Sequence, residues 1–502
     1  MASTWQGKVE NKIAQAKNKI PLEWRLPSSY LEGLQDTSQS VLDIPRRCGI
    51  LSKREIHITE DFDATALLEQ LASRKFTAVE VTTAFCKRAA IAQQLTSCLT
   101  ETFFDTALRR AQVLDDYLTT TGKTMGPLHG LPISLKECFN IADVPTTAID
   151  QLRPRGALAG GGGGVICEDQ HPSDNDDLGR TIITGGEGAL LAMRGSLLGI
   201  GTDFAWSIRV PALCCGLVGF KPSASRVPYG NIGSAARPGL AGFLPCAGPL
   251  CHSVRDVELL LKIVFNSNAA DLDDNALGVP WNSGTCPKSS LRVGFLPEDA
   301  KYPLHPPMQH ALKDAVAKLL AAGHEVIDIS QQMPSIPEAK DVAFRFFNMD
   351  PDRTALAHVT NGGEPFIPSL KATYDLENAA PEPGLRELYE LNVTKAKLAT
   401  RMRQAFTENK VDVIIGPAYQ SCAVPHDTYG VATYTVFCNL FNPVSYHLER
   451  QMLPKMPHLS ETSRTRRSEV EGAPCHIQLV GRPMEDEVLM QHASIVEELL
   501  RS

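Results

Sequence analysis

Two side chains of this chain have the chemistry needed to break an amide bond. Ser207 follows the segment 201–206, where a turn would expose the backbone N–H groups of residues 204 to 207 toward a substrate carbonyl. Such N–H groups form oxyanion holes. Lys136 ends the apolar run 131–135. Burial lowers the pKa of a lysine toward neutrality, which allows it to act as a base for a serine nucleophile.

Each of these residues also has an interpretation without chemistry. Lys136 can be a strand-end lysine that points into water, and Ser207 can be a loop serine in a glycine-rich turn. Asp203 and Arg209 stand on either side of Ser207 as opposite charges, and we expect them to hold the loop rather than to react. The residues alone therefore leave the catalytic assignment open.

Alternating strands and helices must position these residues. Short apolar runs predict buried strands at 131–136, 291–295, 325–329 and 411–415. Helical spacing and capping signals predict helices at 63–72, 77–95, 105–118, 307–322 and 485–500. Pro307 suits a first helical turn, and Gly323 suits a C-terminal cap. The alternation predicts an α/β fold with a largely buried central sheet.

The chain divides into a short N-terminal part and one large unit. Residues 1–60 are predicted to form a polar helical arm and a connector, and residues 61–502 the main domain. Two segments of that domain, near 150–184 and 438–470, are predicted to be irregular. The first contains five glycines at 160–164 before an acidic run, which is typical of a flexible loop. A phosphate-binding loop is the alternative, but no Lys-Ser or Lys-Thr follows the glycines.

Composition argues against several classes of protein. The net charge is −8 without a long basic run, so we expect no nucleic-acid partner. The 13 cysteines form no CxxC pair, which favours reduced thiols in a cytosolic protein. The N-terminus lacks the apolar segment of a secretory signal, and no stretch of about 18 uninterrupted apolar residues predicts a membrane span. We therefore expect a cytoplasmic protein without a membrane partner.

Several sequence blocks, in order along the chain, carry a family resemblance. They are GLPISLKE at 130–137, GGEGAL at 185–190, GIGTD at 199–203, SIRVPA at 207–212, GLVGFKP at 216–222 and GAPCHIQLVG at 472–481. Further blocks stand at 45–52, 81–89, 126–130 and 244–250. Together they resemble the amidase signature family, most closely its fungal acetamidase-type branch. The resemblance covers most of the chain from about residue 20 to 500.

The resemblance implies a fold, a mechanism and a set of site residues. The fold is a single large α/β/α unit with a mixed, mostly buried central sheet. Family members hydrolyse amides with a serine nucleophile, a second, bridging serine and a lysine. By motif, Lys136 takes the place of the lysine and Ser207 that of the acylated nucleophile, while Phe204, Ala205 and Trp206 fall in the oxyanion-hole loop. The resemblance implies a small-molecule amide substrate, no metal and no cofactor, and it allows a homodimer.

The segment before Gly185 departs from the family pattern. The family has Gly-Gly-Ser-Ser there, whereas this chain has Thr-Ile-Ile-Thr at 181–184. Counted without gaps, Ile183 stands where the bridging serine should be, and an isoleucine cannot relay a proton. The hydroxyl of Thr184, one position away, can substitute only if the loop shifts its register.

Two further departures concern Trp206 and the C-terminal region. The family places a small residue, usually glycine, directly before the nucleophile, and Trp206 stands there. A bulky residue is unfavourable if this position needs φ > 0 or close approach to substrate. Alternatively, the indole packs outward and the N–H still serves. The run 447–467 is unusually basic and polar, so a core element of the family is expected to be lost there.

Three hypotheses remain. The leading one is an amidase that converts a small, uncharged carboxamide into a carboxylic acid and ammonia or an amine, through a Ser207 acyl-enzyme with Lys136 as base. The second is a catalytically impaired, amidase-like pseudoenzyme that acts as a binder or scaffold, which Ile183 and Trp206 favour. The third is an unstable or mis-spliced product, in which 150–184 and 438–470 are the altered segments.

Overall fold

The computed structural model of the chain describes most of its residues. The described ranges are 5–32, 40–141, 165–168, 185–230, 232–233, 237–239, 242, 244–284, 288–366, 370–371, 374–377, 382–423, 432–442, 445–450 and 473–501. Side chains are not described for Lys8, for 165–168 or for 446–450.

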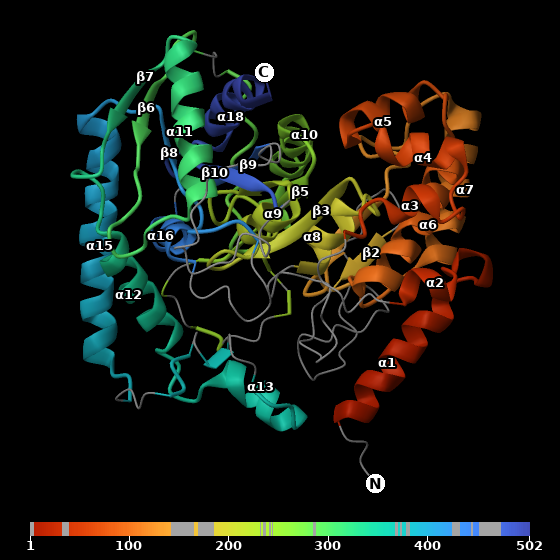
Figure 1. Ribbon diagram of the computed structural model, residues 1–502, viewed down its shortest axis with the longest axis horizontal. Coiled ribbons are helices and arrows are strands. Elements are labelled where there is room, and N and C mark those ends of the chain that lie inside the picture. The colour runs from red at the N-terminus through yellow and green to blue at the C-terminus, as the bar shows by residue number, and fades with distance from the viewer. Residues whose placement is uncertain are drawn as a thin grey trace.

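The strands of the described residues form one mixed sheet that crosses the middle of the molecule (Figure 1). The strands are β1 (Ile133–Lys136), β2 (Val165–Glu168), β3 (Leu198–Asp203), β4 (Val218–Lys221), β5 (Cys246–Cys251), β6 (Arg292–Phe295), β7 (Glu325–Asp328), β8 (Val413–Gly416), β9 (Ser445–Arg450) and β10 (Cys475–Val480). Their order in the sheet is β2-β1-β3-β5-β4-β9-β10-β8-β6-β7. Pairing is parallel among β2, β1 and β3 and among β8, β6 and β7. The pairs in the middle of the sheet, from β3 through β5, β4, β9 and β10 to β8, are antiparallel.

Helices account for most of the remaining described structure. In the N-terminal third they are α1 (Trp5–Lys19), α2 (Ser28–Leu31), α3 (Ile44–Arg47), α4 (Lys53–Glu60), α5 (Ala64–Ala72), α6 (Ala78–Thr96) and α7 (Phe104–Thr121). Later come α8 (Gly185–Ala192), α9 (Arg209–Cys215), α10 (Val254–Phe265), α11 (Pro306–Ala321), α12 (Ile336–Phe347), α13 (Thr354–Gly362), α15 (Leu385–Glu408), α16 (Thr433–Phe441) and α18 (Asp486–Arg501). Short 3₁₀ helices span Leu22–Trp24 and Ala269–Asp271.

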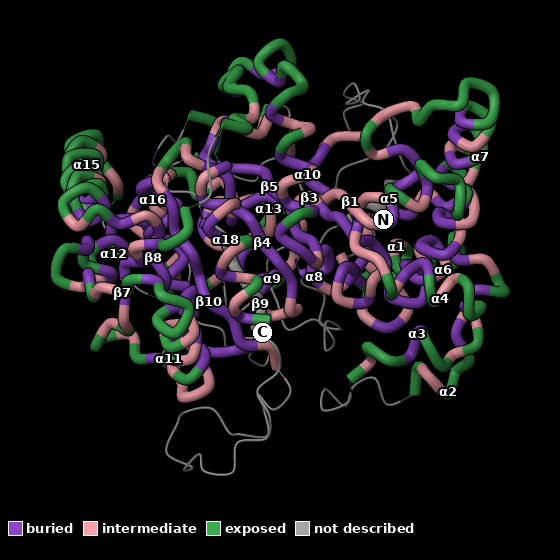
Figure 2. Tube along the Cα trace, turned by 90° about the horizontal axis from the view of Figure 1, so that it is seen from above, coloured by how far each residue is buried: buried purple, intermediate pink, exposed green. Residues whose placement is uncertain are grey.

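Both faces of the sheet are covered by helices. Every residue of β5 and β10 is buried, which requires packing on both sides, because successive side chains of a strand point to opposite faces. Helices α8 and α9 contact β3 and β4, while α10, α11 and α18 contact β5, β9 and β10 and lie together at the top of Figure 1. Figure 2 shows the buried residues along the strands and the exposed ones on outer helices such as α15. The predicted α/β fold with a mostly buried mixed sheet is confirmed.

The predicted elements are confirmed with small shifts of their ends. The strand–helix–strand unit appears as β6, α11 and β7, with a proline in the first turn of α11 and Gly323 at φ +85° just after it. Thr77 and Glu80 form the predicted capping box at the start of α6. Capping satisfies backbone N–H groups that have no partner within the helix, so these sequence signals marked helix starts correctly.

The described start of the segment 438–470 is regular, whereas the sequence predicts an irregular segment there. Residues 433–441 form α16, whose side chains are all buried, and residues 445–450 form β9. Strand β9 lies between β4 and β10 and pairs with both. The basic and polar residues of this run do not predict a strand. A strand between two others can form despite such residues, because backbone hydrogen bonds hold it on both edges. Residues 451–472 lie outside the described part of the chain.

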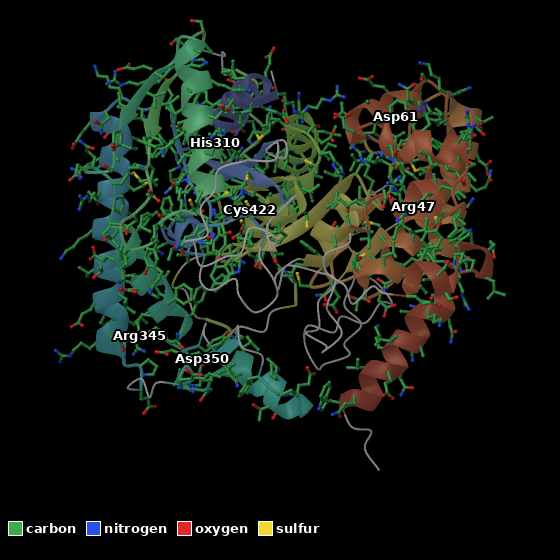
Figure 3. All side chains as sticks on the ribbon, in the orientation of Figure 1. Arg47, Asp61, His310, Arg345, Asp350 and Cys422 are labelled. Atoms are coloured by element: carbon green, nitrogen blue, oxygen red, sulfur yellow. The ribbon has the colours of Figure 1, made fainter. Side chains whose placement is uncertain are left out.

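Helix α12 matters for the site, and α15 supports it from outside. Arg345 of α12, labelled in Figure 3, donates a hydrogen bond from Nη2 to Glu387 Oε2 of α15 at 2.6 Å. Phe346, on the inner side of α12, is 1% exposed in the main core. The contact fixes one end of α12 against α15, so the helix is a defined surface for the loops that face it.

Two further sequence expectations concern thiols and membranes. The described cysteines are all free and mostly buried, in agreement with reduced thiols. Cys422, labelled in Figure 3, lies with its Sγ 3.3 Å from that of Cys475. None of the helices that the structure describes has the length and hydropathy that a membrane span requires.

Candidate active site

The parallel pairing of β1 with β3 brings Lys136 and the Ser207 loop to one edge of the sheet. Ser134 is opposite Gly199, and Leu135 is opposite Ile200. Parallel strands end at the same edge, so the last residue of β1 lies beside the last residues of β3. Lys136 ends β1, and the loop that carries Ser207 begins directly after Asp203, the last residue of β3.

The side-chain nitrogen of Lys136 is held by a hydroxyl from β3. Lys136 Nζ donates a hydrogen bond to Thr202 Oγ1 at 3.0 Å. The same oxygen lies 4.0 Å from Cys138 Sγ, and Thr202 also hydrogen bonds with the phenol of Tyr229. Thr202 is 5% exposed, so its hydroxyl is a fixed partner for the lysine. The lysine therefore has a defined orientation rather than a free path into water.

Ser207 lies in the turn between β3 and α9. Its side chain is half-buried, and its hydroxyl has no hydrogen-bond partner within the residues that the structure describes. Ile208 N donates to Asp203 Oδ2 at 3.1 Å, which closes the turn over the end of the strand. A strand–turn–helix geometry of this kind presents a serine at the edge of a sheet, where a substrate can reach it.

Two backbone N–H groups beside Ser207 are directed away from the buried core. Arg209 Nη2 donates to Ala205 O at 3.0 Å, and Val210 N donates to Trp206 O at 2.9 Å. In a trans peptide the C=O and N–H point in opposite directions, so the N–H groups of Trp206 and Ser207 face away from these partners. Neither N–H makes a hydrogen bond to another described residue. This pair can stabilise an oxyanion.

A buried ion pair stabilises the turn that carries Ser207. Asp203 and Arg209 are both 0% exposed, with Arg209 Nε 2.9 Å from Asp203 Oδ2 and Nη2 3.1 Å from Oδ1. Asn439 of α16 donates to Asp203 at 2.8 Å, and Arg209 also donates to Thr435 O of the same helix at 2.9 Å. The two charges are fully occupied with each other and with α16, as expected for residues that hold the loop.

The electrostatics of this pair favour the ionised carboxylate. Burial alone raises the pKa of Asp203, but the charge and hydrogen bonds of Arg209, the Asn439 amide and the charge of Lys221 together lower that pKa to about 2. Asp203 therefore remains charged at any pH at which the protein would work. It supplies a constant negative charge and is no candidate for a proton donor.

The backbone at Trp206 does not require the positive φ that would disfavour a bulky residue. Trp206 is absent from the described residues with positive φ, so its backbone is in the region that any L-residue adopts. The indole stacks on Phe344 of α12, with ring centroids 6.0 Å apart and planes at 18°. The alternative in which the N–H stays available agrees with this geometry, because the indole packs on α12.

Some candidate residues lie outside the described part of the chain, and one contact was not foreseen. Ile183 and Thr184, the candidates at the bridging position, are among the residues that the structure does not describe. Thr202, which holds Lys136, was missed. Its signal was its place in GIGTD, one residue before Asp203, but the sequence does not say that β1 lies beside β3. The pairing of β1 with β3 brings Lys136, Ser207 and the loop 204–206 to one edge of the sheet.

Several known proteins are similar to this chain over nearly its whole length. The Amidase family model matches residues 80–153 and 184–490, and leaves 154–183 unmatched. An amidase of Gibberella moniliformis is 32% identical over 99% of both chains, and an acetamidase of Aspergillus oryzae is 31% identical over 99% of both. Among solved structures, a fatty acid amide hydrolase is similar with a TM-score of 0.84 and 26% identity, covering 98% of this chain and 95% of its own.

Proposed function

The chain belongs to the amidase family, and from this premise we propose that it hydrolyses a small, uncharged carboxamide with Ser207 as nucleophile and Lys136 as base. The observation that carries the proposal is the pair of N–H groups of Trp206 and Ser207, which have no hydrogen-bond partner among the described residues. Such donors favour the transition state of acyl transfer, in which negative charge develops on the carbonyl oxygen.

In the first half of the reaction, Ser207 Oγ attacks the carbonyl carbon of the amide. Its proton passes to the neutral amine of Lys136, directly or through one further hydroxyl, for which Thr184 is the sequence candidate. The oxyanion receives hydrogen bonds from the N–H groups of Trp206 and Ser207. The protonated lysine then gives its proton to the leaving nitrogen as the C–N bond breaks, and ammonia or an amine departs.

In the second half, a water molecule attacks the acyl-enzyme and gives a proton to Lys136. The ester bond to Ser207 breaks, the serine oxygen takes the proton back, and a carboxylic acid is released. Thr202 accepts a hydrogen bond from the lysine, which supports a fixed position of Nζ through both halves. No step of this sequence requires a metal or a cofactor, and we propose a cytoplasmic location, as composition suggests.

Covalent labelling tests the proposed nucleophile. A fluorophosphonate probe is expected to modify the purified protein at one position, and peptide mass spectrometry should place it on Ser207. The Ser207→Ala variant serves as the blank, and the Gibberella amidase as the positive control. If that relative reacts while Ser207 stays unmodified and acetamide is not consumed, the chain is an amidase-like binder rather than an enzyme.

The contact between Lys136 and Thr202 gives a second prediction. Thr202→Val keeps the shape of the side chain but removes the oxygen that holds Nζ 3.0 Å away. We expect kcat to fall roughly 10- to 100-fold with little change in KM, because a mispositioned base slows proton transfer. Thr202→Ser should restore most of the rate. A Thr202→Val enzyme with wild-type kcat and an unchanged pH–rate profile would remove Thr202 from the mechanism.

A further inference from the structure

The indole of Trp206 is placed by packing against helix α12. It stacks on Phe344 and meets Phe347 edge-on, with ring centroids 6.3 Å apart and planes at 75°. Its Nε1–H is buried and has no hydrogen-bond partner among the described residues. Aromatic contacts rather than a polar anchor therefore determine where the ring lies.

A fourth ring completes this arrangement. Phe204 stands at the start of the same loop. Its ring centroid lies 5.2 Å from that of Phe347, and the ring centroids of Phe347 and Phe344 are 5.4 Å apart. We call Phe204, Trp206, Phe344 and Phe347 the aromatic group. All four side chains are half-buried and pack against the main core. The group bridges the nucleophile loop and α12 with aromatic carbon.

The acyl part of a bound amide must pass close to this group. In the proposed reaction the acyl carbon is bonded to Ser207 Oγ, and its oxygen lies about 2.7–3.1 Å from the Trp206 N–H. The substituent on that carbon therefore starts within a few ångströms of the Trp206 backbone. The indole extends from this backbone to α12, so it fills one side of the space around the acyl carbon.

We propose that Trp206 sets the upper size limit of the acyl group, so that acetyl and propionyl amides are substrates and arylacetyl amides are excluded. This inference rests on the proposed function and adds the substrate class to it. The indole cannot yield easily, because it is packed between two rings that belong to a helix anchored on the core. Inserting extra carbon beside a packed ring forces unfavourable shifts of side chains and backbone.

Removal of the indole ring should allow the enzyme to hydrolyse arylacetyl amides. In Trp206→Ala the space beside Phe344 and Phe347 becomes free, and a phenyl ring can stack there in place of the indole. We expect the ratio of kcat/KM for phenylacetamide to that for acetamide to rise about 10-fold or more over wild type. Trp206→Phe, which keeps a ring on α12, should change the ratio much less.

Added indole provides a rescue test within the same variant. An apolar space left by a removed ring binds a ligand of matching shape. Indole should therefore inhibit phenylacetamide hydrolysis by Trp206→Ala competitively and leave acetamide hydrolysis by wild type unaffected. Trp281→Ala is the matched control, because that indole packs on Phe265 of α10, with centroids 6.0 Å apart, rather than on α12. Its substrate ratio should equal that of wild type.

Two results would overturn the inference. One is a wild-type enzyme that hydrolyses phenylacetamide at least as well as acetamide. The other is a Trp206→Ala enzyme with an unchanged ratio although its melting temperature and Ser207 labelling are normal. If Trp206→Ala does not fold, Trp206→Leu replaces it, since leucine keeps an apolar side chain but leaves most of the ring space open.

Failure of the proposed function gives a different pattern of results. If wild type and variants hydrolyse neither amide and Ser207 stays unlabelled, the catalytic proposal fails. Calorimetric binding of phenylacetate and acetate then decides the size limit. Phenylacetate binding at least about tenfold tighter to Trp206→Ala than to wild type, with acetate unchanged, supports the limit. Equal phenylacetate affinities for the two proteins overturn it.

Discussion

Replacement of Ser207 with alanine is expected to lower kcat for acetamide by roughly 10⁴- to 10⁶-fold while the protein stays folded. The serine forms the covalent intermediate, and no other described hydroxyl lies in the turn 204–208 to replace it. Lys136→Ala should cost about 10²- to 10⁴-fold, the usual range for a general base. Initial rates across a pH series, with acetamide saturating, measure both effects.

The two losses should respond differently to added base. A small primary amine such as methylamine is expected to restore part of the Lys136→Ala activity in proportion to its free-base concentration, and none of the Ser207→Ala activity. Exposed residues of the same types supply controls, so Ser267→Ala and Lys262→Met should retain wild-type kcat. Wild-type turnover by Lys136→Ala would exclude the lysine as base, whatever the labelling of Ser207 shows.

Loss of the charge on Asp203 is expected to be the most destabilising single change at the site. Asp203→Asn leaves the guanidinium of Arg209 buried without its counter-charge, and such a change typically costs about 3–5 kcal/mol. This is a large share of a total stability that is roughly 5–15 kcal/mol. The shift of the urea midpoint at constant m-value measures it. Adding Arg209→Met to the variant should recover part of the loss, because the unpaired charge is then gone.

An exposed ion pair is the control for this prediction. Arg237 and Asp352 form a pair with side chains 42% and 73% exposed, so Asp352→Asn should cost no more than about 1 kcal/mol. A similar small cost for Asp203→Asn would mean that the buried pair is dispensable, and the turn would then need another explanation for its geometry.

The stability difference between wild type and Asp203→Asn should depend on pH in a defined direction. The folded pKa of Asp203, about 2, lies below its unfolded value of about 3.9. A carboxylate with a lowered folded pKa contributes stability above the unfolded pKa and loses that contribution as the pH falls through the folded pKa. The difference should therefore be constant above about pH 5 and shrink between about pH 4 and pH 2.

The sequence predicted the secondary-structure elements of the site better than the side-chain contacts between them. Strand β1, the turn after β3 and the roles of Asp203 and Arg209 follow from local patterns, since an apolar run, a glycine-rich turn and a flanking charge pair are visible within a few residues. The strand–helix–strand unit β6-α11-β7 was visible for the same reason. Local patterns report local structure because capping, periodicity and turn chemistry act over a few residues.

The contacts that were missed join segments far apart in the chain. Thr202 meets Lys136 only because β3 is the neighbour of β1, and Phe344 meets Trp206 only because α12 packs beside the loop after β3. Neither of these contacts can be predicted from the local sequence of the residues that make it. Strand β9 was also missed, since its polar letters predict an exposed segment although its backbone pairs on both sides. Tertiary context decides such cases.

The place of β9 in the sheet has a consequence for how this protein is made. Among the described strands, β4 and β8, both buried along their whole length, are joined across the sheet through β9 and β10, which follow both of them in sequence. Because a ribosome delivers the chain from its N-terminus, β4 leaves the exit tunnel long before its neighbour exists. Until residues 445–480 emerge, the nascent chain carries two apolar open edges, each able to recruit a strand from another molecule. Chains that stop short of this segment should therefore be found with chaperones or in aggregates rather than in solution.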